Sequence, residues 1–404
     1  MTKLARQVVE LASDPANETK RELWKRHNAL QGSSPVIFVY PDGAWFELIP
    51  PGSLTCENEW ARKIEYQLRQ RIIRGQLIPD DVPIEKSLII EKAVIEINQG
   101  WGLVPEKVYS DQARGAWHFS PVVKDPSDWK KLTKPQLDYD EKRTLDQFEQ
   151  TRACLGNILD VQLSGIRDFG FHMMHLYCDF RGLNEMMMDL ILEPDMVHSV
   201  ISFILEGYQG LIAQALSQNL VSLNNNDKFH YTGGLGYTDE LPAPGFDSDH
   251  VRLRDVWGAA EAQEFSGVSP EMHEEFILQY ERKLLAPFGL NGYGCCDDLT
   301  RKLPNVLKIK NLRRISISPW ADVASCAQQL GKRYIMSWKP QPAYLAYEEF
   351  DEELVGHYLE EQIAKGKDGY MEIVLRDTHT CRNDPGRFTR FVNLCRQAVA
   401  RNHL

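Results

Sequence analysis

From about residue 158 to the C-terminus, apolar residues follow two alternating periodicities. Short apolar runs typical of buried strands occupy residues 158–163, 221–225, 289–295, 314–317, 333–337 and 370–375. Between them apolar residues recur every three or four positions, which is the spacing of one helix face. Such helical patterns cover residues 269–288, 298–309, 321–330, 350–365 and 385–400. Strands that alternate with helices predict βαβ units and a parallel sheet.

The first third of the chain is less regular. Its pattern predicts helices over residues 6–30, broken at Asp14-Pro15, and over residues 57–75 and 139–155. Short strands are predicted at residues 35–40, 93–97 and 116–123. The number of strand–helix units favours an α/β fold of the closed (β/α)8 TIM barrel type over an open sheet. We therefore predict a helical extension with a lid-like segment over residues 1–90 and the barrel, a single catalytic domain, over residues 91–404.

Composition and charge exclude several classes of protein. The 404 residues are 43% hydrophobic and 25% charged, as in an ordinary globular protein. With 46 Lys and Arg against 57 Asp and Glu, the net charge is −11, and no basic block suggests a nucleic-acid partner. No apolar run approaches the roughly 20 residues that cross a bilayer, and the N-terminus lacks a signal-peptide pattern. We expect a cytoplasmic protein with no membrane partner, whose eight cysteines are thiols. Whether it forms a homo-oligomer stays open.

Candidate chemistry follows from the rule that a barrel carries its active site at the carboxyl ends of its strands. Cys295 and Cys296 end one predicted strand, His379 and Cys381 follow another, and Glu264 precedes a helix. Thiolate, imidazole and carboxylate groups together suit Zn²⁺, and a catalytic zinc has three protein ligands and one open position. One of the adjacent cysteines, His379, and either Glu264 or Cys381 would make such a set. The same residues could instead be small buried thiols of the core, or serve other catalysis.

Four segments resemble the uroporphyrinogen decarboxylase superfamily, and within it the corrinoid-dependent methyltransferases. They read YGCCDDL at 293–299, RRISISPWAD at 313–322, RYIMSWKPQPAYL at 333–345 and VLRDTHTCRNDPGRF at 374–388. In these methyltransferases an H-x-C-G-N pattern binds zinc. This chain keeps the Cys, has Tyr293 or Gly294 in place of the His, and carries His379 or Cys381 near the third ligand position. The Arg-rich N-terminal motif of the decarboxylase is replaced by FVYPDGAWFELIPPGS, which argues against uroporphyrinogen as the substrate.

The resemblance implies a uroporphyrinogen decarboxylase-type barrel and a zinc-dependent methyltransferase. It would move a methyl group from a small methylated substrate, for example a methoxylated aromatic in an O-demethylation, to a corrinoid protein. Cob(I)alamin carried by that partner would become methylcobalamin. Glu264 and Asp297 are the catalytic candidates, as ligand, support of a ligand or proton donor. The alternatives are a decarboxylase of a carboxylated ring compound and a small-molecule-binding barrel without catalysis.

The family folds its N-terminal segment over the barrel mouth, so aromatic residues there are candidates to line the substrate pocket. Polar residues after the strand at 221–225, and on the long loop that follows, are candidates to contact substrate. The predicted substrate-binding residues are Tyr40, Trp45, Trp101, His118, Asn224, Asn225, His230 and Tyr237. Ordinary packing and turn formation are the alternative for each. His172 and His175, in the helical string FHMMHLY, are interpreted as partly buried histidines with satisfied hydrogen bonds.

Overall fold

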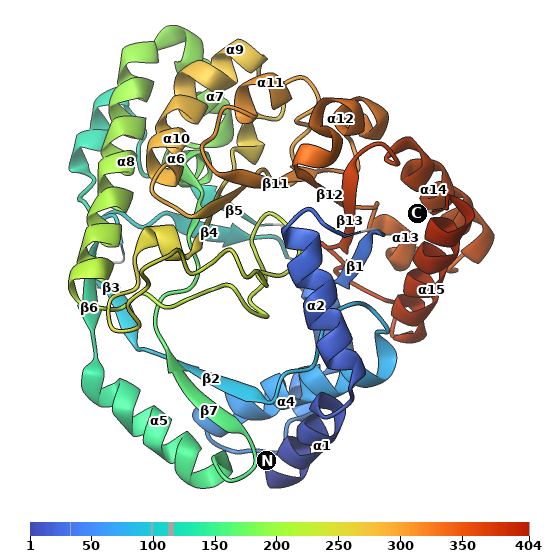
Figure 1. The fold of residues 1–404 in the computed structure, drawn as a ribbon. Helices are drawn as coiled ribbons and strands as arrows, with labels where there is room; N and C mark the ends of the chain where they lie inside the picture. The colour runs from blue at the N-terminus through green and yellow to red at the C-terminus, as the bar shows by residue number, and fades with distance from the viewer. Residues whose placement is uncertain (33, 98–99, 112–116, 404) are drawn as a thin grey trace.

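A parallel seven-stranded sheet forms the centre of the molecule (Figure 1). The computed structural model describes residues 1–404 except 33, 98–99, 112–116 and 404. The strand order is β1-β13-β12-β11-β10-β9-β8. The bounds are β1 Val36–Val39, β8 Gly170–Phe171, β9 Trp257–Ala260, β10 Leu290–Tyr293, β11 Leu312–Ile317, β12 Ile335–Trp338 and β13 Tyr370–Leu375. Both faces of these strands are almost entirely buried, as expected for a parallel sheet covered on each side. The predicted α/β class with a parallel sheet is confirmed.

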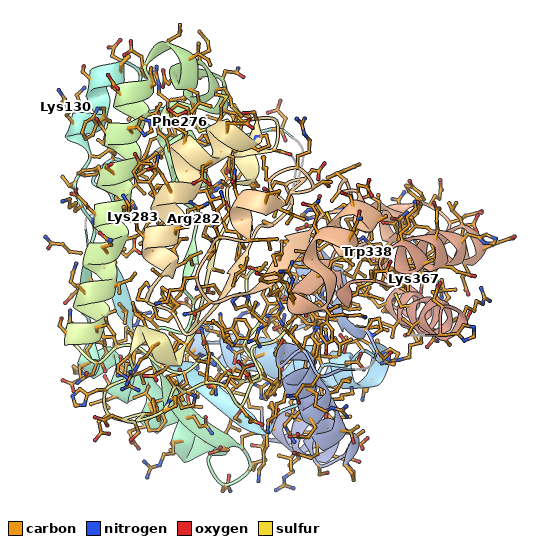
Figure 2. All side chains as sticks on the ribbon, turned by 45° about the horizontal axis from the view of Figure 1, so that its top comes forward. Lys130, Phe276, Arg282, Lys283, Trp338 and Lys367 are labelled. Atoms are coloured by element: carbon orange, nitrogen blue, oxygen red, sulfur yellow. The ribbon has the colours of Figure 1, made fainter. Side chains whose placement is uncertain are left out.

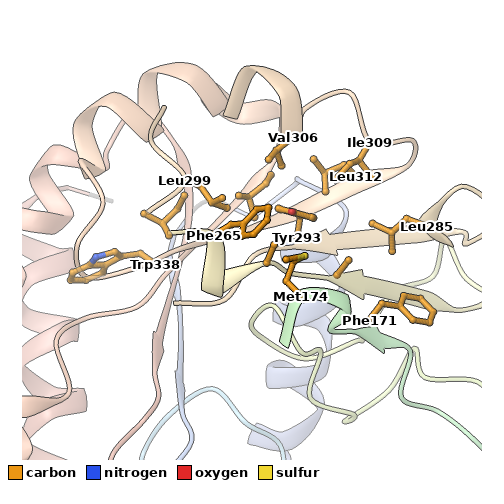
Figure 3. Packing of buried hydrophobic residues seen from close by; sticks show 14 of the residues in the cluster. Phe171, Met174, Phe265, Leu285, Tyr293, Leu299, Val306, Ile309, Leu312 and Trp338 are labelled. Carbon is orange, nitrogen blue, oxygen red and sulfur yellow. The ribbon is translucent and has the colours of Figure 1, made fainter. Parts of the chain in front are cut away.

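Helices follow the strands along the chain. They are α6 Met173–Arg181, α7 Leu183–Leu192, α8 Pro194–Ser217, α9 Pro270–His273, α10 Gln279–Leu285, α11 Leu303–Val306, α12 Val323–Leu330, α13 Ala343–Ala346, α14 Glu352–Lys365 and α15 Gly386–Arg401. Phe171, Leu285 and Val306 belong to the core that joins them to the sheet (Figure 3). On one helical run Phe276 is buried whereas Lys283 is exposed (Figure 2), so the run presents an apolar face to the core.

Three predicted elements differ from the structure. The helix over residues 269–288 contains a π-helical turn, η6 Glu274–Leu278, between α9 and α10. The helix over residues 298–309 shrinks to α11, because Asp298 accepts hydrogen bonds from Thr300 in a turn instead. The strand over residues 221–225 shrinks to a single bridge from Val221 to Ile166. There the side chain of Asn224 bonds both the N–H and the carbonyl of Trp257, in place of backbone pairing.

The N-terminal segment contributes more than helices. It holds α1 Thr2–Ala12, α2 Ala16–Asn28, η1 Asp42–Ala44, α3 Trp45–Leu48, η2 Pro51–Ser53 and α4 Glu59–Leu77, and also strand β1. Two carboxylates accept hydrogen bonds from backbone N–H groups on the outer edge of β1. The N–H of Val39 donates to Asp80 at 2.9 Å, and that of Ile37 donates to Asp81 at 2.7 Å. Part of the predicted extension is therefore an integral edge of the sheet.

A second region pairs apart from the seven strands. Strand β2 Ser87–Glu91 runs parallel to β7 Asp160–Ser164, at the end of the molecule that also holds α4 and α5 Glu141–Leu155 (Figure 1). Two antiparallel pairs accompany it, β3 Val94–Ile97 with β6 Gln136–Tyr139 and β4 Glu106–Tyr109 with β5 Trp117–Ser120. Short turns complete the described elements: η3 Pro126–Lys131, η4 Leu253–Asp255, η5 Gln263–Phe265 and η7 Gly331–Arg333.

By length and composition, one helix in the described residues could span a membrane. This is α8, with 24 residues and a mean hydropathy of 1.2 over its most apolar window. In that window 33% of the residues are buried, and α8 packs against α6, α7 and α10.

The long loop between α8 and β9 packs closely onto the sheet and positions Tyr231. A Cβ atom on Gly233 would lie 1.8 Å from Ser337 Oγ and 2.7 Å from Glu372 Oε1. Gly234 has a φ of +51°, which favours glycine. These glycines let the loop approach the strands. The loop thereby brings Tyr231 to the carboxyl edge of the sheet.

Candidate functional site

Two thiols and a carboxylate meet where β10 and β13 end. Cys295 and Cys296 follow β10 after Gly294, whose φ of +89° turns the chain. The Cys295 and Cys296 Sγ atoms lie 3.5 Å apart, and Cys296 Sγ lies 3.5 Å from Asp377 Oδ2 in the turn after β13. Because parallel strands have their carboxyl ends at the same edge of the sheet, the turns after β10 and β13 bring Cys296 and Asp377 into contact. We call Cys295, Cys296, Tyr231 and Asp377 the thiol site.

The surroundings of the two thiols favour opposite protonation states. The hydrogen bond with Cys296 lowers the pKa of Cys295, burial opposes this, and the charge of Lys339 adds to the lowering. The same hydrogen bond and burial raise the pKa of Cys296. Lys339 is itself buried and donates to the carbonyl of Thr232 at 2.6 Å and to the hydroxyl of Ser316. Cys295 is therefore the thiol that ionises first.

A polar chain leads away from Cys295. The Tyr231 hydroxyl lies 3.8 Å from Cys295 Sγ, and its ring centroid is 4.3 Å from that of His172. His172 Nδ1 lies 2.9 Å from Oε1 of the buried Glu261, whose other oxygen accepts from the N–H of Gln263. Burial raises the pKa of Tyr231, so its proton stays on the hydroxyl at neutral pH. The chain holds a proton donor beside the thiolate.

The two predicted catalytic carboxylates have different partners. Asp297 is buried and accepts from the N–H of Cys295 at 3.3 Å. Burial raises its pKa to about 6, against the lowering effect of Lys302. Glu264 lies 2.9 Å from Nδ1 of His175 on α6. That hydrogen bond raises the pKa of His175 to about 9, so Glu264 faces an imidazolium near pH 7.

Two other predicted zinc ligands, Cys381 and His379, lie in the turn after β13. The thiol of Cys381 donates to Glu47 Oε2 at 3.2 Å, and burial and that carboxylate raise its pKa to about 12. His379 is exposed in the turn where Asp377, two residues earlier, contacts Cys296. In the residues that the structure describes, no group of three or more His, Cys, Asp and Glu side chains could hold a metal ion. The predicted three-ligand set is not assembled there.

The predicted aromatic lining residues divide into two groups. Tyr40 and Trp45 line a cavity of about 240 Å³ together with Gln67 and Arg71. The guanidinium of Arg376, directly before Asp377, lies 5.2 Å from the Tyr40 ring centre, which places this cavity near the thiol site. Trp101 instead packs against Phe203 and Tyr208, and His118 is exposed on β5.

The predicted polar lining residues hold the long loop in place. Asn224 bonds Trp257 as described above, and Asn225 donates to the carbonyl of Leu241. His230 is buried 4.8 Å from the Trp257 ring, and burial lowers its pKa to about 3. The Tyr237 hydroxyl donates to Glu85. Each of these polar groups is thus bonded within the chain, and together they position Tyr231.

Several residues of the site were given no role by the sequence pattern. Lys339 follows β12 directly and Asp377 lies two residues after β13, so the rule that found Cys295 could also have found them. His172 does have a satisfied hydrogen bond, as interpreted, but its partner is a site carboxylate, Glu261. Tyr231 had no sequence signal, because its loop has no periodicity and reaches the site only through its close packing on the sheet.

Comparison with known proteins identifies a fold likeness. The chain is similar in structure to a methyltransferase from Methanosarcina mazei, with a TM-score of 0.54 over 93% of this chain and 97% of that chain. The two sequences are 11% identical. No protein-family model matches the sequence, and no curated protein matches it. The likeness therefore establishes a shared fold over almost the whole of both chains.

Proposed function

We propose that this chain transfers a methyl group from a small methylated compound, such as a methoxylated aromatic, to a corrinoid protein. The observation that carries the proposal is the meeting of the thiol pair, Asp377 and Tyr231 at the carboxyl edge of a parallel sheet. The fold likeness to a protein named as a methyltransferase supports it. The carboxyl edge is also where α/β proteins bind their ligands.

The proposal includes a closed barrel of the uroporphyrinogen decarboxylase type. Two observations support closure. The bridge between Ile166 and Val221 is parallel, and β2 runs parallel to β7. These segments would continue the seven-stranded sheet around the space that the loop after Val221 occupies.

The residues of the polar chain have defined roles in this reaction. When the bond between the methyl carbon and an aryl oxygen breaks, the leaving oxygen needs a hydrogen-bond donor. Tyr231 keeps its proton near pH 7 and lies beside His172, which Glu261 orients. Tyr231 would donate to the leaving oxygen, and His172 would hold Tyr231 in place. The methyl group would leave on the opposite side, toward the corrinoid of the partner.

Zinc remains a prediction. A zinc ion bound to a thiolate would polarise the substrate oxygen, and Cys295 is the thiol with the lowered pKa. Because the described residues hold no three-ligand set, the roles above are assigned without it.

An anaerobic assay tests the proposal. The purified chain is mixed with cob(I)alamin and guaiacol, and the loss of cob(I)alamin absorbance is followed together with methylcobalamin and catechol by chromatography. Tyr231→Phe should slow transfer roughly 10²-fold or more, the usual contribution of one hydrogen-bond donor to the negative charge that develops on a leaving oxygen. Cys154→Ser, a change at an exposed thiol on α5, is the matched control and should transfer at the wild-type rate. Metal analysis of the same preparations tests zinc.

Two other outcomes would replace the proposal. Release of carbon dioxide from a carboxylated ring compound, without methyl transfer, would identify a decarboxylase. Saturable binding of small molecules, with no turnover beside free or protein-bound corrinoids, would identify a binding protein.

A further inference from the structure

A second, larger cavity adjoins the cavity at Tyr40 and Trp45, with which it shares Gln67 and Arg71. It has a volume of about 510 Å³ and is lined by α4, β2, α5 and the turn after β7. These elements form the separate region of the fold (Figure 1). None of the four residues of the thiol site lines it.

The lining of this cavity is cationic. Lys63, Arg71, Arg143 and Arg167 contribute four positive charges, against two negative charges from acidic lining residues. This excess stands out in a chain with a net charge of −11. Among the described residues, none of the four cationic side chains forms an ion pair with a carboxylate.

Two of these arginines differ in how they are held. Arg71 is anchored, because its Nη1 donates to the carbonyls of Glu85, at 3.3 Å, and of Ser87. The guanidinium of Arg167 makes no hydrogen bond within the part of the chain that the structure describes. The charge of Asp227 acts on both arginines: burial raises the pKa of Asp227, and the charges of Arg71 and Arg167 lower it. Glu85 also acts on Arg71 but is already paired with Arg21 at 2.8 Å, so Asp227 is left opposite two guanidinium groups.

The rest of the lining is apolar or aromatic. Ile64 and Ile90 are buried, and Trp60 is half-buried with its indole N–H bonded to Thr151 at 3.1 Å. That bond fixes the indole at the wall of the cavity. A flat apolar group can therefore contact a rigid aromatic wall while a charged group faces the arginines.

We propose that this cavity binds a small organic anion, an aromatic ring that carries a carboxylate or phosphate group. The ring lies against Trp60, and the anionic group bonds Arg167 and Arg71. Guanidinium groups bind both kinds of anion through paired, charge-assisted hydrogen bonds. The site goes beyond methyl transfer and does not depend on it.

Calorimetric titration at low salt tests the proposal, with benzoate and phenyl phosphate as probes and benzamide as the uncharged analogue of benzoate. One molecule of at least one anion should bind per chain, and benzamide should bind at least tenfold more weakly. Whichever anion binds more tightly identifies the carboxylate or the phosphate as the preferred group. Arg167→Gln should weaken binding roughly tenfold, the loss of one charge-assisted contact.

The control variants separate this site from other sources of affinity. Arg152→Gln removes an exposed arginine of α5 that pairs with Glu149 outside the cavity, and it should bind like wild type. Cys296→Ser should also bind like wild type, even if it abolishes methyl transfer. Lys63→Gln, at an exposed side chain of the rim, provides a second test if Arg167→Gln unfolds.

Three results would overturn the proposal. They are binding of benzamide as tight as that of benzoate, wild-type affinity in a folded Arg167→Gln, and loss of binding in Cys296→Ser. The last would move the ligand to the thiol site.

Discussion

Two buried carboxylates on the same sheet have opposite properties. Glu372 lies within β13 and Asp297 lies at the carboxyl edge after β10, and both are about 1% exposed or less. Burial raises the pKa of each. For Glu372 the charge of Arg314 and the hydrogen bond from His27 outweigh burial and bring the pKa to about 2, whereas Asp297 stays at about 6. Glu372 is held ionised by a close ion pair, with Arg314 Nε 3.0 Å from Oε1, and belongs to the scaffold, whereas a buried carboxylate without such a pair marks the site.

The difference lies in the partners. Arg314 Nη2 donates to Glu372 Oε2 at 3.2 Å and to Asn28 Oδ1 at 2.6 Å, and its guanidinium lies 5.2 Å from the Trp257 ring centre. These contacts tie α2 to the interior of the sheet. Asp297 accepts one long hydrogen bond, and its Oδ2 has no partner in the described residues.

The largest expected effect comes from breaking the interior pair. Glu372→Gln leaves Arg314 buried without its counter-charge, so the free energy of unfolding should fall by about 3–5 kcal/mol. Urea denaturation at pH 7 measures this. Arg401→Gln, the control, breaks a surface pair with Glu360 on α14 and should cost about 1 kcal/mol or less. Equal losses in the two variants would show that the interior pair is not part of the scaffold.

Substitution of Asp297 should increase the free energy of unfolding, opposite to the effect of Glu372→Gln. Its pKa is about 6 in the folded chain and near the ordinary 3.8 when unfolded. The protonated acid therefore favours folding below about pH 4, and this contribution is lost as pH rises through 6. The gap corresponds to about 3 kcal/mol. Asp297→Asn should raise the free energy of unfolding by about 2–3 kcal/mol at pH 8 and leave it nearly unchanged at pH 4.

Urea denaturation at the two pH values measures the effect at Asp297. A gain that is the same at both would mean that ionisation of Asp297 does not weaken the fold.

The same contrast explains how much of the fold the sequence could predict. Strands such as residues 370–375 were located within a residue, because strands of a buried parallel sheet are continuous apolar runs. The strand predicted at 221–225 is reduced to one bridge, because the side chain of Asn224 makes the hydrogen bonds to Trp257 that backbone groups would make in a strand. The pattern of apolar residues does not indicate such a bond. The interior pair was also missed, since Arg314 and Glu372 sit inside apolar strands where charges are unexpected.

For the candidate site, the sequence predicted that the cysteines lie at the carboxyl edge of the sheet, but not which residues contact them. Cys295 and Cys296 follow from the position of β10. That Asp377 contacts Cys296 depends on the course of one turn, in which Asp377 has a φ of +57°. Tyr231 depends on loop packing between residues far apart in sequence. Long-range contacts of this kind leave no local pattern.

The smallest expected effect concerns the shared hydrogen bond of the thiol pair. Because that bond from Cys296 is the main cause of the lowered pKa of Cys295, Cys296→Ala should move the pH midpoint of Cys295 alkylation upward, and Cys296→Ser, which keeps a donor, should move it less. At pH 7 the ionised fraction should fall roughly threefold to tenfold in Cys296→Ala. Iodoacetamide labelling followed by mass spectrometry gives the midpoint, which does not depend on access to the thiol, with exposed Cys154 as the internal standard. If Cys296→Ala left the midpoint unchanged, Lys339 rather than the neighbouring thiol would control the ionisation of Cys295.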